Sequence, residues 1–247
     1  MTGGRLFTGT SGFSYPAWAP RFYPPGTRSA DLLREYSARL AACELNNTFY
    51  ARPTVERIKG WIAATPESFR FVVKGQRGAS LRALGTDASE SVRWLLEPLP
   101  AFGERLGAVL FRVPDPVGRD DDRLASLLRV WPREVPLVAE FQHASWDVDE
   151  THDALREAGA VLCATDLDDQ PAPPSIRVTG PFLYLRLRRT SYTDEELDAW
   201  AARVVPFIDA GLDAYVIFRH DEDGTSALRA EEFPGRVAKL SAADVST

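Results

Sequence analysis

Acidic and basic residues recur at the ends of short apolar segments along this 247-residue chain. The carboxylates in these positions are Glu44, Glu140 and Asp166, and the cations are Lys74, Arg112, Arg186, Arg188 and Arg219. Carboxylates serve as general acids and bases, and the planar guanidinium group binds phosphate or carboxylate through two parallel hydrogen bonds. If the segment ends meet in space, these residues predict acid–base chemistry on an anionic substrate.

The apolar segments have the length of β-strands and are separated by amphipathic stretches typical of helices. The predicted strands are residues 6–10, 43–49, 70–74, 107–113, 137–142, 161–167, 182–188 and 214–220. Eight strands with about seven helices predict an α/β fold, a TIM-barrel-like (β/α)8 formed as one domain by residues 1–247. An open doubly wound sheet is the alternative, but the chain contains no GxGxxG after a strand.

Several helix starts can be predicted from capping residues. Ser29 is placed to cap a helix over residues 31–42, and Asp87 with Glu90 opens another. Thr193 and Glu196 form a capping box, in which each side chain satisfies a backbone N–H of the other. Residues 168–181 contain four prolines, so the crossover between the sixth and seventh strands should be irregular.

Alternation along the strands predicts which side chains face the barrel interior, because successive residues point to opposite faces. We assign the polar set of the second strand, Glu44, Asn46 and Thr48, to the interior. The same reasoning places inward Lys74, Arg112, Glu140, Asp166, Arg186, Arg188 and Arg219. These side chains would meet at the carboxyl-terminal face, where barrel enzymes carry their active sites. The alternative is an ion-pair lattice that plugs the barrel without performing chemistry.

Composition limits the partners. The chain has a net charge of −6, with 26% charged and 45% hydrophobic residues, which argues against coating a nucleic acid or an anionic membrane. We expect a small anionic substrate instead, with nucleic acid bound only as a local nucleotide. No apolar stretch approaches membrane-spanning length and no secretory signal is visible at the start. With only two cysteines, the expected compartment is the cytoplasm.

Two further stretches could border the predicted site. Residues 12–29 carry five aromatic side chains among four prolines, which predicts a packed cover over one side of the mouth or an aromatic wall that stacks a ring. Gly224, Thr225 and Ser226 open the last helix and could bind phosphate through backbone N–H groups. The acidic residues 221–223 would oppose an anion there.

Taken in order, several stretches resemble the domain-of-unknown-function-72 family, the YecE-like proteins. They are GTSGFSYPAW, ELNNTFYARP, EFQHASW, YLRL and YVIFRHDEDG, together with Trp61, Thr65, Pro66, Phe69, Phe71 and Lys74. The resemblance implies a TIM-barrel-like fold and no particular reaction. The matching positions are Glu44, Asn46, Thr48, Tyr50, Lys74, Glu140, His143, Trp146 and Arg186. The chain departs from the family at Gln142, Ala144, Arg188, Arg189, Arg219 and His220.

Four mechanisms fit these residues. In the first, Glu140 is the base of an acid–base enzyme, and Glu44 or Asp166 is the second carboxylate; such a pair would also allow glycoside hydrolysis. In the second, Lys74 forms a Schiff base, against the alternative of a salt bridge to Glu44 or Glu140. The third is a divalent-metal-dependent phosphodiester hydrolase or isomerase with ligands from Glu44, Glu140, Asp166, His143 and His220. The fourth is a non-catalytic ligand-binding barrel.

The favoured prediction is a hydrolase or lyase that performs acid–base chemistry on an anionic substrate, without a metal or another cofactor. Its expected catalytic residues are Glu140, Glu44, Lys74 and Asp166. The residues expected to bind substrate are Asn46, Thr48, Tyr50, Arg112, His143, Trp146, Arg186, Arg188 and Arg219.

Overall fold

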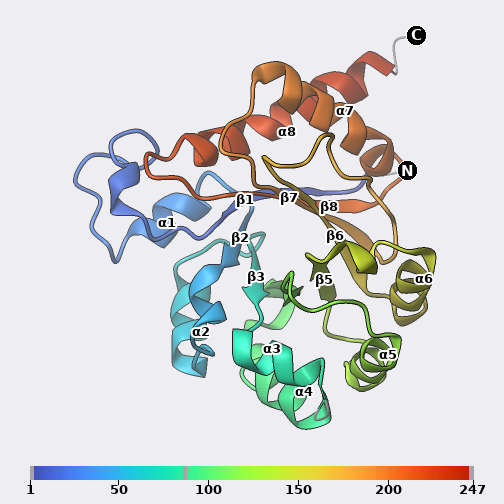
Figure 1. Ribbon diagram of the computed structural model, residues 1–247. Coiled ribbons are helices and arrows are strands. Elements are labelled where there is room, and N and C mark those ends of the chain that lie inside the picture. Colours follow the sequence, from blue (N-terminus) through green and yellow to red (C-terminus); the bar gives the residue numbers. More distant parts are fainter. Residues whose placement is uncertain (1–2, 86–87, 245–247) are drawn as a thin grey trace.

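The computed structural model describes residues 3–85 and 88–244, and its centre is a closed barrel of parallel strands in chain order (Figure 1). The strands are β1 (Leu6–Ser11), β2 (Ala42–Leu45), β3 (Arg70–Lys74), β4 (Leu106–Val113), β5 (Leu137–Phe141), β6 (Val161–Asp166), β7 (Phe182–Leu187) and β8 (Asp213–Phe218). Closure comes from the pairing of β1 with β8. The predicted TIM-barrel-like fold is therefore confirmed.

Helices surround the barrel (Figure 1). They are α1 (Leu32–Ser37), α2 (Val55–Ala63), α3 (Arg77–Ala83), α4 (Ala88–Leu96), α5 (Asp121–Val130), α6 (Asp149–Ala158), α7 (Asp194–Asp209) and α8 (Thr225–Asp244). The described chain thus holds eight α-helices rather than about seven, because α3 and α4 share one crossover. No helix lies between β6 and β7, as the prolines predict. No described helix is long and apolar enough to cross a bilayer.

The helix starts bear out some of the capping predictions. The Thr193–Glu196 capping box is present at α7. The first helix begins at Leu32 and ends at Ser37, and its preceding residue Asp31 provides no side-chain cap, so the longer helix capped by Ser29 is wrong. Asp87 lies outside the described residues, and α4 begins just after it.

Two apolar clusters form the core. The inner cluster fills the barrel and includes Phe7, Val72, Leu110, Tyr184 and Tyr215. The outer one lies between strands and helices and continues into the first loop, where Trp18, Phe22 and Tyr23 are fully or almost fully buried. That loop is therefore the packed cover predicted as one of its two interpretations.

Two predictions about strand faces are wrong. The second strand ends at Leu45, and residues Asn46–Phe49 form a short 3-10 helix, so strand alternation does not apply to Asn46 and Thr48. In β6 the inner cluster contains Val161 and Cys163, so Asp166 points outward. Both faces of a barrel strand are buried, which is why apolar character alone could not decide between them.

Candidate functional site

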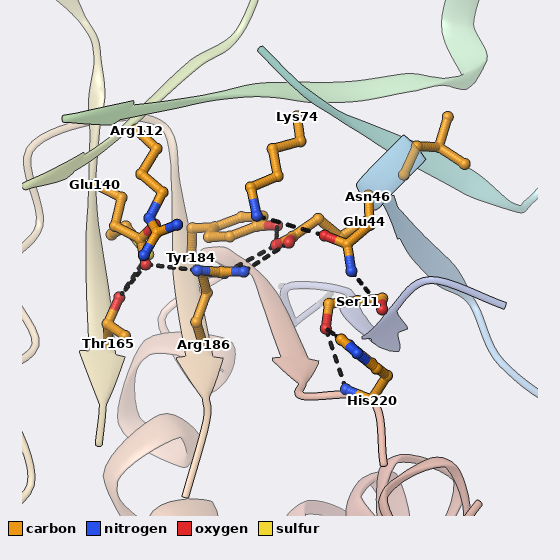
Figure 2. A network of polar contacts seen from close by, with 12 residues as sticks. Ser11, Glu44, Asn46, Lys74, Arg112, Glu140, Thr165, Tyr184, Arg186 and His220 are labelled. Carbon is orange, nitrogen blue, oxygen red and sulfur yellow. Dashed lines mark hydrogen bonds and ion pairs between the residues drawn. The ribbon is translucent and has the colours of Figure 1, made fainter. Parts of the chain in front are cut away.

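The carboxyl-terminal mouth of the barrel contains a buried ion-pair network centred on Arg186 (Figure 2). The guanidinium group donates to both oxygens of Glu44, from Nε at 2.9 Å and from Nη2 at 2.7 Å. Its Nη1 donates to Glu140 Oε1 at 2.6 Å. One guanidinium thus joins two carboxylates from opposite sides of the barrel, β2 and β5.

Neighbouring strands complete the network. Tyr184, two residues before Arg186 on β7, donates its hydroxyl to Glu44 Oε2 at 3.0 Å. Thr165 on β6 donates to Glu140 Oε1 at 2.8 Å. Arg112 on β4 lies opposite Glu140 in the β4–β5 register, and its Nε is 3.1 Å from Glu140 Oε2. That ion pair is not an aligned hydrogen bond, since neither atom has a hydrogen-bond partner.

Charge pairing outweighs burial at both carboxylates. Burial alone would raise the pKa of Glu140, but the charges of Arg186 and Arg112, with the hydrogen bonds, lower it to about 2. The pKa of Glu44 is also lowered, because Arg186 and Lys74 oppose the effect of burial. A carboxylate this acidic is a weak base at neutral pH, which argues against Glu140 as the general base.

Lys74 lies beside this network without joining it (Figure 2). Its Nζ donates to Asn46 Oδ1 at 3.4 Å and lies 4.8 Å from the ring centre of Phe49, and in the described chain it has no ion pair within 4.0 Å. The residue is only 8% exposed. The expected salt bridge to Glu44 or Glu140 is therefore absent, because Arg186 already occupies both carboxylates.

Burial, with the nearby charge of Arg186, lowers the pKa of Lys74 from 10.5 to about 8, although Glu44 and Glu140 act in the opposite direction. An amine with this pKa is partly unprotonated near neutral pH. It can accept a proton, donate one or attack a carbonyl carbon.

Arg188 adds a further positive charge to the mouth. It is partly buried, and no described residue forms an ion pair or side-chain hydrogen bond with it. Burial and the charge of Arg186 lower its pKa. Burial likewise lowers the pKa of His220, and the charges of Arg188 and Arg219 add to this effect. The mouth thus holds more cationic groups than its two carboxylates balance.

Asn46 and Thr48 support Lys74 from the short 3-10 helix after β2. Asn46 accepts from Lys74 and donates its Nδ2 to the Ser11 carbonyl at 2.8 Å. The Thr48 hydroxyl is directed at two carbonyls, that of Leu45 at 2.5 Å and that of Lys74 at 2.8 Å. Thr48 is therefore a structural brace, and the Asn46 amide links the Lys74 amine to the Ser11 carbonyl.

The other predicted binding residues lie outside the network. Tyr50 is 80% exposed, and His143 bonds to Ser145 within its own turn. Trp146 is buried, donates to the Val117 carbonyl and stacks on Phe141. Arg219 contacts Thr190 at 3.3 Å. His220 bonds to Ser11, which fits a loop anchor better than a metal ligand.

Asp166 is a structural residue of the outer layer. Its carboxylate accepts hydrogen bonds from Arg189 Nε at 2.9 Å, from the Tyr192 hydroxyl at 2.9 Å and from Trp200 Nε1 at 3.1 Å. These partners come from the segment after β7 and from α7. The prediction that Asp166 joins the cavity acids is therefore wrong, because its side chain ties β6 to α7.

The start of α8 is occupied by the chain's own carboxylates. Asp221 accepts from the backbone N–H groups of Gly224 and Ser226, at 2.8 and 2.5 Å, and Asp223 accepts from that of Thr225 at 3.2 Å. The N–H groups considered for phosphate binding are thus already bonded, and that prediction is not supported.

A cavity of about 660 Å³ opens beside the network, between β5, β6 and the irregular crossover that follows β6. Glu140, Cys163 and Thr165 line its inner part, and His152 lines it as well. Sequence reasoning missed Thr165 because the face of β6 was misassigned. In the described chain, no group of three or more His, Cys, Asp or Glu side chains could hold a metal ion.

Comparison with known proteins agrees with the architecture. The family profile described as "Protein of unknown function DUF72" matches residues 7–245. The UPF0759 protein YunF of Bacillus subtilis is 28% identical, and the match covers 83% of this chain and 86% of that protein.

Two solved structures support the same conclusion. A DUF72 family protein of Thermotoga maritima (TM1631) superposes with a TM-score of 0.82 at 26% identity, covering 95% of this chain and 99% of that one. One from Enterococcus faecalis (EF0366), at 22% identity, shares the fold with a TM-score of 0.75 over 97% of this chain and 98% of that one. This chain therefore belongs to the DUF72 family of proteins of unknown function.

Proposed function

We propose that the protein is an enzyme that performs acid–base chemistry on a small anionic substrate at the carboxyl-terminal mouth of its barrel. The observation that carries this proposal is the buried amine of Lys74, which has no carboxylate partner among the described residues. A buried, unpaired ammonium group is costly in a purely structural site. Such a group at the functional face of a barrel is typical of catalytic lysines.

The substrate class follows from the charges around Lys74. Arg112 and Arg188 are the guanidinium groups of the mouth that the Arg186 network does not fully engage. Guanidinium groups bind phosphate and carboxylate, so a phosphate- or carboxylate-bearing metabolite, including a nucleotide, fits this site. With a net charge of −6, we expect neither a nucleic-acid polymer nor a membrane as partner. A reducing, cytoplasmic location suits the two free, buried cysteines.

The geometry changes the roles expected within the site. Lys74, with its pKa near 8, is the acid–base group, whereas Glu140 and Glu44 hold Arg186 in place. Arg186 in turn helps to keep both carboxylates ionised, together with Arg112 at Glu140 and Lys74 at Glu44. Asp166 has no part in the reaction, because it lies in the outer layer.

A ligand screen followed by product analysis tests the proposal. Thermal shift with phosphate- and carboxylate-bearing metabolites detects binding. A ligand at 100 times its dissociation constant adds about 2.7 kcal/mol to the free energy of unfolding. For any metabolite turned over, Lys74→Met should reduce kcat by about 10² to 10⁴-fold. Lys59→Met, an exposed lysine on α2, is the matched control.

The pH profile gives a second readout. If the unprotonated amine acts, kcat should rise with pH around an apparent pKa of about 8. Full activity of folded Lys74→Met would refute the proposal. Binding without product in every case would favour a non-catalytic ligand-binding barrel.

A second candidate function is imine formation at Lys74, favoured by the same missing salt bridge. The amine nitrogen would attack a carbonyl carbon, and the resulting carbinolamine would lose water to give a Schiff base. Borohydride reduces such an imine to a stable secondary amine. Mass spectrometry after treatment with anionic aldehydes or ketones should locate the added mass on Lys74, and its absence there would exclude this route.

The metal-dependent hydrolase or isomerase receives less support from the geometry. The carboxylates suggested as ligands, Glu44 and Glu140, each accept two hydrogen bonds or more within the Arg186 network. A divalent cation would have to compete with that guanidinium group. Activity of the purified protein with and without added divalent ions separates the two mechanisms.

A further inference from the structure

The cavity beside the ion-pair network is built into the barrel wall. β5 and β6 pair at two positions only, Val138 with Val161 and Ala139 with Leu162, whereas β4 and β5 pair at five. Beyond Ala139 the two strands have no paired residues, and the crossover after β6 holds no helix to cover the opening. The resulting space of about 660 Å³ has the size of a small-molecule site.

The inner part of this cavity offers a hydrogen-bond acceptor. Glu140 lines it, and the buried Oε2 atom of that side chain has no aligned hydrogen-bond donor. Because Arg186 and Arg112 already balance the charge of Glu140, this oxygen requires a donor but no further cation. A hydroxyl group of a ligand meets that requirement.

A second polar group without an aligned hydrogen bond lines the same cavity. His152 is 2% exposed, with Asp147 Oδ1 at 3.2 Å from Nε2 and Asp149 Oδ1 at 3.8 Å from Nδ1, and neither ring nitrogen has an aligned hydrogen-bond partner. A neutral imidazole donates from one nitrogen and accepts at the other. Hydroxyl groups likewise both donate and accept, so they suit His152 and Glu140 equally well.

The remaining lining selects against a second anion. Asp115, Asp147 and Asp169 line the cavity, with Arg177 as the single arginine or lysine among its lining residues. Pro171 and Pro174 provide apolar contact surface. The C–H face of a polyhydroxylated ring can pack on such surfaces, while the hydroxyl groups of the ring reach the polar side chains.

We propose that this cavity binds the polyhydroxylated, sugar part of a substrate whose anionic group is held at the barrel mouth. This inference rests on the proposed function for the anionic end, and it adds the class of the remaining part. Glu140 belongs to both regions, so it connects the sugar site with the cations around Lys74. The substrate class is accordingly the sugar phosphates.

Binding measurements with three kinds of probe test this inference. The probes are inorganic phosphate, a panel of aldose and ketose phosphates of three to seven carbons, and the corresponding free sugars. At least one sugar phosphate should bind tenfold or more tightly than inorganic phosphate. If none does while inorganic phosphate binds, the sugar site is refuted and the anion site at the mouth stands.

A cavity-filling variant gives the matched comparison. Ala172 is an exposed residue of the crossover that lines the cavity, so Ala172→Trp fills it without disturbing the core. This variant should lose the tenfold higher affinity for the sugar phosphate and keep its affinity for inorganic phosphate. Ala199→Trp, on the exposed face of α7, should change neither affinity. Circular dichroism verifies that both variants fold.

The outcomes separate the two proposals. A tenfold gain that survives in Ala172→Trp would overturn the sugar site, because the sugar would then bind elsewhere. Binding of free sugars that Ala172→Trp abolishes, with no response to any phosphate, would support the cavity and overturn the anion site. No binding of any probe would overturn both.

Discussion

Replacement of Arg186 by methionine is the strongest perturbation that the structure suggests. The guanidinium group is 1% exposed and donates three hydrogen bonds to two carboxylates. Methionine leaves Glu44 and Glu140 buried and without their main counter-charge. Removal of one partner from a buried ion pair costs about 3 to 5 kcal/mol. At about 2 to 4 °C per kcal/mol for a chain of this size, the melting temperature should fall by about 6 to 20 °C.

The pH dependence of that loss is more specific than its size. The pKa of Glu140 is about 2 in the native protein and 4.5 in the unfolded chain. The stabilisation from its ion pairs is therefore fully present above pH 4.5 and is lost as the pH falls toward 2. Without Arg186, burial should raise the pKa of at least one carboxylate above 4.5. Folded Arg186→Met would then bind more protons than its unfolded chain, and its stability should increase on acidification from pH 8 toward 5.

Urea unfolding followed by circular dichroism at pH 5, 6.5 and 8 measures both effects. Glu44→Gln added to Arg186→Met removes one buried charge, so the double variant should be more stable than Arg186→Met at pH 8. Arg156→Met, which removes an exposed pair with Asp153, should change stability by about 0.5 kcal/mol or less. A loss below 1 kcal/mol for Arg186→Met, or a native-like pH profile, would refute the reasoning.

Three further predictions concern other residues. The pKa of Lys74 is about 8 in the folded chain and 10.5 in the unfolded chain, so the free energy of unfolding should increase as the pH rises from 8 to 10.5. In chemical denaturation, Lys74→Met should not show this increase. Asp166→Asn should lower stability by about 3 kcal/mol in the same assay and leave ligand affinity unchanged; a tenfold loss of affinity in the folded variant would contradict its structural role. Asp221→Ala removes two backbone hydrogen bonds at the start of α8 and should cost about 1 kcal/mol in thermal melts, whereas an unchanged melting temperature would contradict the capping role.

Local sequence signals were enough to predict the architecture. Eight apolar segments at regular spacing, the Thr193–Glu196 capping box and the prolines between β6 and β7 each appear in the structure as expected. These signals are short-range, because strand propensity, capping and proline geometry depend on neighbouring residues. Charged residues at strand ends likewise predicted that Glu44, Lys74, Glu140 and Arg186 meet at one face, since parallel strands share their direction.

Only the tertiary structure decided how those charges are paired. The sequence could not exclude a salt bridge at Lys74 or an inward Asp166, because both faces of a barrel strand are buried. In the outer layer, Asp166 accepts hydrogen bonds from two side chains of the segment after β7 and from Trp200 on α7. Arg186 forms ion pairs with both Glu44 and Glu140. Ion pairing depends on distances of a few ångströms between side chains far apart in the chain. Those distances, which leave Lys74 without a carboxylate partner, are set by the closed barrel and not by any local pattern of residues.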